Sequence, residues 1–366
     1  MGRNKIVISG YYGFRNAGDE AMLYSILKTL DTAFDSPEVT VISGNPSATA
    51  SSFDVKAVPR FGGLSIFNAI RQSYLLISGG GSLLQDVTSW KSLMYYLSII
   101  FTGVCFGDKV FLYAQGIGPV RHRWVRWVLR FVLNHVDAIT VRDSESKGFL
   151  ERLGVKNKIY CTADAVLSLS PVPGDKGKEI LKACGVPTDK KIIGISIRRW
   201  NEFADWGNVL NRYIDDITEK ENCSVVFIPM QYPEDWKAAA EIYNQNPNVY
   251  LLKKSLSTEE LMSLIGNMDQ LIGIRLHALI FAALMHVPFI GISYDPKIDN
   301  FLQSVNEKAI FTLEDFDAEE LFAKSAALLH VDKKDLDWSA VDGLRKKAKE
   351  TADILKQVVG SKGVEK

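Results

Sequence analysis

The chain has 366 residues, of which 47% are hydrophobic and 23% charged, as in a soluble globular protein with room for two domains. Its 43 basic and 43 acidic residues give zero formal net charge, so no overall field attracts nucleic acid. The four cysteines, Cys105, Cys161, Cys184 and Cys223, form no CxxC or Cys/His cluster. This argues against structural zinc and a disulfide framework, and it predicts a reducing cytoplasmic setting without a signal peptide.

Short apolar segments alternate with helical patterns along the chain, which predicts an α/β fold with parallel sheets. Residues 93–106 form the longest apolar stretch, which is too short for the ~20 residues of a spanning helix and is expected to be a buried helix. Residues 168–178 hold two prolines and two glycines and are predicted to link two Rossmann-like domains. We expect an N-terminal, acceptor-side domain over 1–170, a C-terminal, donor-side domain over 171–335, and a helix and tail over 336–366.

The first glycine-rich turn, residues 10–20, reads GYYGFRNAGDE. Gly13 and Gly18 have the spacing of a P-loop, but Asp19 and Glu20 stand where Lys and Ser/Thr are required. Carboxylates there would repel a triphosphate, so an ATPase is excluded, and the GxGxxG dinucleotide fingerprint is also absent. Glu20 is expected to complement the dipole of the helix that follows. Asp19 is expected to be a catalytic carboxylate.

The second glycine-rich turn is Gly79-Gly80-Gly81-Ser82, predicted to follow a strand and precede a helix. Three glycines allow a ligand to approach the backbone closely and expose its N–H groups. The turn therefore predicts binding of an anion or a sugar.

Cationic side chains follow several of the later predicted strands. They are Arg142, Arg198, Arg199, Arg275, His277 and Lys297. Since parallel strands present their carboxyl ends at one edge of a sheet, these groups are expected to converge on a ligand with a carboxylate and a phosphate. Arg275 and His277 supply a fixed cation and a titratable proton donor at one strand-to-helix turn. The alternative for each cation is a surface salt bridge, and the remaining four histidines are interpreted as structural.

Residues 121–135 (RHRWVRWVLRFVLNH) form a basic amphipathic helix with two tryptophans. Such a helix suits an anionic membrane surface. It also suits packing between elements, with the arginines extending to solvent. Both interpretations stay open at this point.

The segments GYYGFRNAGDE at 10–20, ISGGGS at 77–82, VRD at 141–143 and GIRLH at 273–277 make the chain resemble the polysaccharide pyruvyl transferase family, nearest to the CsaB type. The resemblance implies a GT-B-like fold of two Rossmann-like domains facing a central crevice. It implies phosphoenolpyruvate as donor and a 4,6-linked pyruvyl ketal as product. It further implies an acceptor with N-acetylmannosamine in a lipid-linked secondary cell-wall polymer precursor, whose ketals anchor S-layer proteins.

Together, these observations assign catalytic roles to Asp19, His277 and Arg275. Substrate binding is assigned to Arg142, Lys297, Gly79, Gly80, Gly81, Arg198 and Arg199. No metal or cofactor is expected. The expected partners are phosphoenolpyruvate, a lipid-linked ManNAc-GlcNAc-type acceptor and the inner face of the cell membrane, with no nucleic acid. Two alternatives are a nucleotide-sugar-dependent glycosyltransferase of GT-B fold and a non-catalytic sugar-phosphate binding protein.

Overall fold

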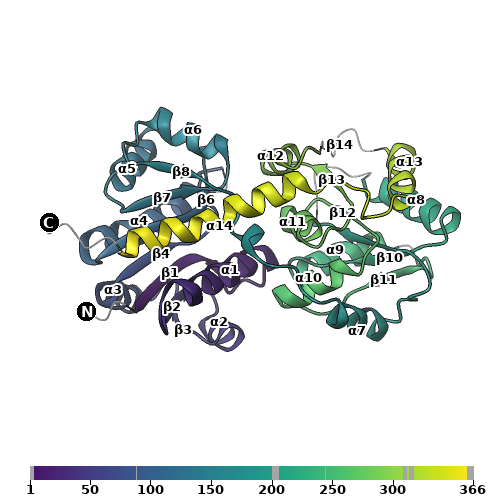
Figure 1. Cartoon of the computed structure of the whole chain (residues 1–366), viewed down its shortest axis with the longest axis horizontal. Coiled ribbons are helices and arrows are strands. Elements are labelled where there is room, and N and C mark those ends of the chain that lie inside the picture. The colour runs from purple at the N-terminus through teal and green to yellow at the C-terminus, as the bar shows by residue number, and fades with distance from the viewer. Residues whose placement is uncertain are drawn as a thin grey trace. The chain divides into compact units, whose positions relative to one another are not determined.

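The structure, a computed structural model, describes residues 4–87, 89–199, 206–243, 245–307, 311–312 and 317–360. These residues form two compact units (Figure 1). The first unit holds the described residues up to 14, residues 19–169 and those from 344 onward. The second unit holds the short segment 15–18 and the described part of 170–343.

The first unit is built on a parallel sheet in the order β3-β2-β1-β4-β6-β7-β8, with β5 paired to β6. Its strands are β1 (Lys5–Tyr12), β2 (Glu38–Ser43), β3 (Lys56–Pro59), β4 (Leu75–Ser78), β5 (Gly81–Leu84), β6 (Lys109–Ile117), β7 (Ala138–Val141) and β8 (Ile159–Cys161). The central strands are apolar on both faces because helices cover both sides of the sheet.

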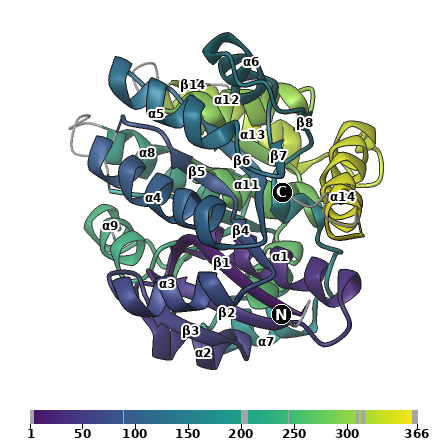
Figure 2. The same ribbon diagram turned by 90° about the vertical axis from the view of Figure 1, so that its left-hand side faces the viewer.

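The helices of the first unit are α1 (Ala17–Ala33), α2 (Pro46–Phe53), α3 (Gly63–Gln72), α4 (Trp90–Phe106), α5 (Arg123–Leu133), α6 (Ser144–Leu153), a 3₁₀ turn (Ala165–Ser168) and most of α14 (Ser339–Gly360). Figure 2 shows α3, α4 and α5 on one side of the sheet and α14 on the other. The helix predicted near the C-terminus is thus observed, and the Tyr74 hydroxyl donates a hydrogen bond of 2.8 Å to the Val359 carbonyl at its end.

Helix α4 confirms the predicted buried helix for one of its faces. Ser89 caps its start, accepting a hydrogen bond of 3.2 Å from the Lys91 amide. Leu93 and Leu97 are buried in the core, whereas Phe101 is 44% exposed. No helix within the described ranges is both long enough and apolar enough to cross a bilayer.

The segment after the second glycine-rich turn corrects one expectation. A helix was predicted there, but the chain forms strand β5 and the next helix begins only at Trp90. Gly81 has a φ of +99°, a backbone conformation that favours glycine, and it pairs with Gln115 of β6. After the turn, the chain therefore runs through the sheet as strand β5 before it continues into helix α4.

The second unit has a parallel sheet in the order β11-β10-β9-β12-β13-β14. Its strands are β9 (Ile192–Ser196), β10 (Ser224–Phe227), β11 (Val249–Leu251), β12 (Gln270–Gly273), β13 (Phe289–Ser293) and β14 (Phe311–Thr312). Its helices are α7 (Asp175–Ala183), α8 (Trp206–Lys220), α9 (Glu234–Ile242), α10 (Thr258–Gly266), α11 (Leu276–Leu284), α12 (Pro296–Ser304) and α13 (Ala318–Leu329).

Both sheets have the Rossmann strand order, in which successive strands are added on one side of the first strand and then on its other side. The change of side lies between β1 and β4 in the first unit and between β9 and β12 in the second. The two glycine-rich turns follow β1 and β4, and Arg198 and Arg275 follow β9 and β12. The prediction of two Rossmann-like parallel-sheet domains is confirmed. Ligands in such sheets bind outside the carboxyl ends of the strands at this switch point, where these residues lie.

Candidate active site

The first glycine-rich turn is divided between the two units, because residues 15–18 group with the second. Asn16 forms an antiparallel bridge with Gln231, and the Ala17 amide donates a hydrogen bond of 2.7 Å to the Met230 carbonyl. The Gly18 amide donates to Asn16 Oδ1 at 3.1 Å, which closes the turn on itself. Asn16, Ala17 and Gly18, the first three residues of the NAGDE motif at 16–20, are therefore part of the second unit.

His277 lies in the first turn of α11, and its ring packs against Gly18. A Cβ atom at position 18 would overlap the Nδ1 edge of that ring. Only glycine lets the 15–18 segment approach the imidazole so closely, and this contact limits where the ring can lie. The position of His277 at a helix N-terminus also exposes it to the partial positive charge there, which favours an anionic ligand nearby.

Arg275 is held by a carboxylate that the sequence analysis did not identify. Its Nε donates to Asp235 Oδ2 at 3.1 Å, and its terminal nitrogen pairs with Asp235 Oδ1 and reaches Gln231 Oε1 at 3.5 Å. The Asp235 side chain is 2% exposed and also accepts the amides of Met230 and Gln231. Burial raises the pKa of Asp235, and the Arg275 charge opposes that rise. The guanidinium is therefore fixed in orientation by a bidentate partner.

Replacing Asp235 with alanine is expected to lower the free energy of unfolding by about 3 kcal/mol, because it leaves the Arg275 charge largely buried without its partner. Urea denaturation measures the change. Glu241→Ala is the matched control in the same unit, since its pair with Arg199 is exposed and is worth less than about 1 kcal/mol. Equal effects of the two substitutions would contradict the structural role of Asp235.

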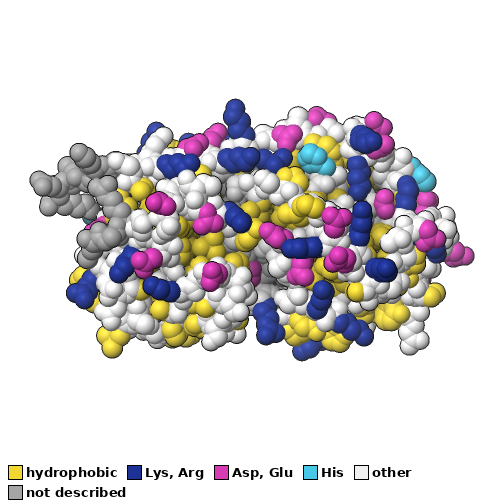
Figure 3. All heavy atoms as spheres, turned by 60° about the horizontal axis from the view of Figure 1, so that its bottom comes forward, with side chains coloured by type: hydrophobic (Ala, Val, Ile, Leu, Met, Phe, Trp, Pro, Cys, Tyr) yellow, Lys and Arg dark blue, Asp and Glu magenta, His cyan; other side chains and the backbone are white. Residues whose placement is uncertain are grey.

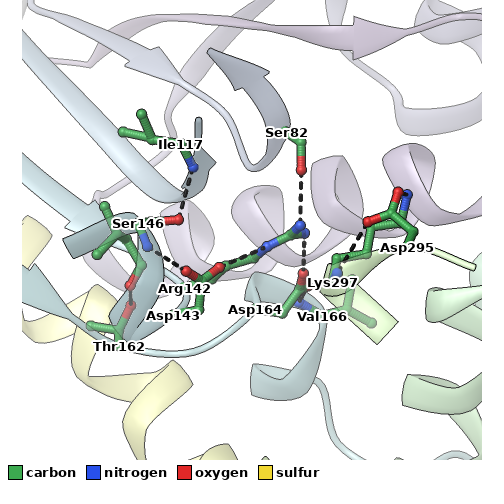
Figure 4. Close-up of polar contacts among 11 residues, drawn as sticks. Ser82, Ile117, Arg142, Asp143, Ser146, Thr162, Asp164, Val166, Asp295 and Lys297 are labelled. Atoms are coloured by element: carbon green, nitrogen blue, oxygen red, sulfur yellow. Dashed lines mark hydrogen bonds and ion pairs between the residues drawn. The ribbon is translucent and has the colours of Figure 1, made fainter. Parts of the chain in front are cut away.

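In the first unit, Arg142 follows β7 and is tied to three oxygen-bearing side chains (Figure 4). Its guanidinium donates to Asp164 Oδ2 at 3.0 Å and to Ser82 Oγ at 2.9 Å, and it lies 3.7 Å from Asp143 Oδ2. The side chain is only 8% exposed. Arg142 thus connects the second glycine-rich turn to the strand ends of β7 and β8. Asp164 was missed from the sequence, where it is one more acidic residue after a short strand.

The Asp19 carboxylate lies beside the same glycine-rich turn. A Cβ atom at Gly81 would stand 3.5 Å from Asp19 Oδ1, which places this oxygen next to the backbone of the turn. Glu20 behaves differently, because its Oε1 accepts the Gly13 amide at 2.8 Å. Burial raises the pKa of Glu20, and the Gly13 and Phe14 amides oppose that rise. Glu20 therefore folds the loop back onto the start of α1, as well as standing in that helix's first turn.

Two buried phenol groups lie near the turn. The hydroxyls of Tyr12 and Tyr96 have no hydrogen-bond partner among the described residues. The Tyr12 hydroxyl lies against the Cα of Gly79. Its pKa is raised first by burial and then by the charges of Asp19 and Glu20. A buried hydroxyl that finds no protein partner is a feature of sites that receive a ligand or a bound water.

The buried Gln115 side chain forms hydrogen bonds with the start of the second glycine-rich turn. Its Nε2 donates to Ser78 Oγ at 2.8 Å and to the Gly79 carbonyl at 2.6 Å. The strand is irregular just before it, and Ala114 has a φ of +46°, which is strained for a residue with a side chain. Strain of this kind is retained where it directs a neighbouring side chain to a functional position.

The remaining predicted cations differ in their surroundings. Arg198 donates to the Tyr294 hydroxyl at 3.2 Å, and both Arg198 and Lys297 lie over the Tyr294 ring at 5.3 and 5.6 Å from its centroid. Lys297 pairs with Asp295 at 2.9 Å (Figure 4). Arg199 instead forms an exposed ion pair with Glu241 at 3.1 Å, the surface arrangement that the sequence left open.

The described part of the chain contains no cluster of side chains that suits a metal ion. No group of three or more His, Cys, Asp or Glu side chains there is placed to hold an ion. The second unit holds the imidazole of His277 beside Arg275, and the first unit holds the Asp19 carboxylate and Arg142.

Solved structures with a similar fold include the UDP-GlcNAc 2-epimerase from Methanocaldococcus jannaschii, with a TM-score of 0.68 and 14% identity over 96% of this chain and 99% of that chain. The UDP-GlcNAc 2-epimerase from Neisseria meningitidis has a TM-score of 0.65 and 12% identity over 96% and 100%. The E. coli ADP-heptose lps heptosyltransferase II has a TM-score of 0.53 and 14% identity over 89% and 98%. At these identities the similarity establishes the fold alone, and it confirms the GT-B-like prediction.

No curated protein matches the sequence. The sequence model of one family, described as polysaccharide pyruvyl transferase, matches residues 16–296. This range begins at Asn16, the first residue of the NAGDE motif, and includes both Arg142 and the turn with Arg275 and His277. The chain therefore belongs to the polysaccharide pyruvyl transferase family and is a transferase.

Proposed function

We propose that this transferase uses phosphoenolpyruvate as donor and forms a 4,6-linked pyruvyl ketal on a sugar. The observation that carries the proposal is the α11 N-terminus, where Arg275 and His277 stand at the switch point of the second sheet. Asp235 orients the guanidinium and Gly18 limits the position of the imidazole. A fixed cation beside a proton donor is the combination that an anionic enol ester requires.

The donor carries a carboxylate and a phosphate, and both need cations. Arg275 and Lys297 are proposed to bind these groups, with Arg142 and Arg198 as further candidates. The Lys297–Asp295 pair has side chains about one-third exposed, so exchanging Asp295 for a substrate phosphate costs little. Arg199, in its exposed ion pair, is the weakest of the predicted substrate contacts.

In the proposed reaction, protonated His277 delivers its proton to the methylene carbon of phosphoenolpyruvate, and the C2 carbon becomes electrophilic. One sugar hydroxyl forms a bond to C2 and gives its proton to Asp19. The second hydroxyl then bonds to C2 as the C2–O bond to phosphate breaks. Its proton restores His277, and the proton on Asp19 leaves with phosphate or solvent, so no oxidant or reductant is needed.

The acceptor is proposed to be N-acetylmannosamine in a ManNAc-GlcNAc-type unit of a lipid-linked precursor of a secondary cell-wall polymer that anchors S-layer proteins. The glycine-rich turn at Gly79, Gly80 and Gly81 supports a sugar at this edge of the first sheet. The three glycines are buried, and the turn lies beside the Asp19 carboxylate and the buried Tyr12 hydroxyl. A carboxylate and a phenol hydroxyl suit sugar hydroxyls better than they suit phosphate, which the carboxylate repels.

The test is to incubate the protein with phosphoenolpyruvate and a panel of lipid-linked disaccharides, measuring phosphate release and the mass of each acceptor. Release of one phosphate per pyruvyl group gained supports the proposal. Transfer from a UDP-sugar in the same assay, without use of phosphoenolpyruvate, would replace it with the glycosyltransferase alternative. Saturable binding of sugar phosphates with no turnover of either donor would replace it with a binding function.

A further inference from the structure

Exposed large hydrophobic side chains gather on one part of the first unit. Ten such side chains occur among the described residues, and nine lie between residues 61 and 131. They are Phe61, Leu64, Val87, Trp90, Phe101, Phe106, Trp124, Trp127 and Phe131. A contiguous group of this kind marks an interaction surface, whereas exposed apolar residues scattered singly do not.

Ring contacts join five of these residues across α4 and α5, and α3 lies beside α4 (Figure 2). Trp90 and Trp124 have ring centroids 5.5 Å apart, and Trp127 stacks on Phe131 at 5.9 Å. Phe101 of α4 lies 6.5 Å from Phe131 of α5. We call the surface of α4 and α5 formed by Trp90, Phe101, Trp124, Trp127 and Phe131 the aromatic face.

Every Lys, Arg, Asp or Glu side chain of helices α3, α4 and α5 is basic. Helices α3, α4 and α5 contain Arg71, Lys91, Arg123, Arg126 and Arg130, and no Asp or Glu. Arg121 stands just before α5. The whole chain is balanced at 43 charges of each sign, and on the face shown in Figure 3 basic and acidic side chains are intermixed. The aromatic face is therefore locally basic in a neutral protein.

Helix α5 carries apolar side chains on more of its surface than packing against the core of the first unit requires. Val125, Leu129, Val132 and Leu133 are buried in the core of the first unit, which accounts for packing. Trp124 and Trp127 remain 49% and 68% exposed on the other side of the helix, and in the sequence they alternate with Arg123, Arg126 and Arg130. Packing in the core explains one face of α5. The second apolar face makes ring contacts with Trp90 and Phe101 of α4 and stays about half exposed or more at Trp124 and Trp127.

We propose that the aromatic face binds the surface of an anionic lipid bilayer. Tryptophan rings prefer the level of the lipid head groups, where an apolar body and a polar N–H are both accommodated. Arginines between them are attracted by the negative surface potential of anionic lipids. Binding is interfacial, in agreement with the absence of a spanning helix from the described ranges.

A second copy of the chain fits this surface less well. A twofold dimer places the same patch on both subunits, so the cations of α5 would face one another with no carboxylate from these helices between them. Like charges at a buried interface are unfavourable. A bilayer with acidic head groups supplies the missing negative charge.

The test is cosedimentation with vesicles of phosphatidylcholine alone and of phosphatidylcholine with phosphatidylglycerol. The protein is expected to bind the anionic vesicles and to be released by salt. Arg121→Gln/Arg123→Gln/Arg130→Gln should lower the partition coefficient about a hundredfold, at about fivefold for each cation. Arg126 is left in place because its Nε donates to the Val120 carbonyl at 2.6 Å.

The matched control removes the same charge from exposed positions of α14, as Lys346→Gln/Lys347→Gln/Lys349→Gln. It should leave vesicle binding nearly unchanged. A separate variant, Trp124→Ser/Trp127→Ser, should weaken binding while retaining its salt dependence. Thermal melting of each variant checks that the fold is retained.

Equal losses in the α5 and α14 variants would overturn the proposal, because general charge and not the aromatic face would then bind the lipid. So would the absence of binding by the unmodified protein. Self-association removed by the tryptophan substitutions, without vesicle binding, would assign the face to a second copy. No substrate is present in these measurements, so their outcome is independent of the proposed reaction.

Discussion

His277→Gln is expected to fold normally and to lose turnover of phosphoenolpyruvate by about 10²–10⁴-fold, the usual cost of removing a general acid. Glutamine fills a similar volume and offers a hydrogen bond, but its amide cannot protonate carbon. Phosphate release under saturating donor measures the loss. His330→Gln is the control, because His330 is exposed and pairs with Glu221 at 3.0 Å. Near-normal turnover by His277→Gln would remove the acid role.

Gly18→Ala tests the same role of His277 by displacing its ring without changing its chemistry. An alanine Cβ cannot occupy position 18 without moving the His277 ring or the 15–18 segment. Turnover should fall strongly although no titratable group is lost, since a displaced proton donor is ineffective. Full activity in this variant would mean that the ring position observed against Gly18 is not the one used in catalysis.

Asp19→Asn is expected to reduce turnover by about 10²–10⁴-fold as well, because the amide cannot accept the proton of the attacking hydroxyl. Binding of phosphoenolpyruvate should survive, since the proposed donor cations are unchanged, and calorimetry measures it. A folded variant that no longer binds the donor would instead assign Asp19 to the architecture of the binding site.

The neighbouring residue supplies a matched control for charge. Glu20→Gln removes one negative charge next to Asp19, but its carbonyl oxygen can still accept the Gly13 amide. Turnover should therefore change little. A loss as large as that of Asp19→Asn would show that the local negative charge, and not the Asp19 base, is what the reaction needs.

Local patterns were sufficient where one short segment carries the whole signal. Apolar runs such as residues 75–78 and 271–274 indicate strands buried on both faces, and their alternation with helical segments predicted two parallel sheets. Arg275 and His277 could be named as candidates because a strand, a polar turn and a helix follow one another within one segment. The resemblance to a family rested on motifs of the same local kind.

Contacts between distant segments could not be predicted in this way. Asp235 is 40 residues from Arg275 and follows a different strand, and Asp164 is 22 residues from Arg142. Nothing in either local pattern distinguishes these carboxylates from the others in the chain. The strand β5 after the second glycine-rich turn was missed for a related reason, because a segment of four residues becomes a strand only when β6 lies beside it.

The sequence by itself determined the α/β class, the glycine-rich turns and the positions of the candidate cations at strand ends, since these depend on side-chain periodicity and backbone freedom over a few residues. Only the tertiary structure decided which carboxylate orients each arginine, that residues 15–18 pack against His277, and that one face of α5 remains exposed. These depend on which strands become neighbours. That choice is made by the packing of the whole sheet, and no single segment encodes it.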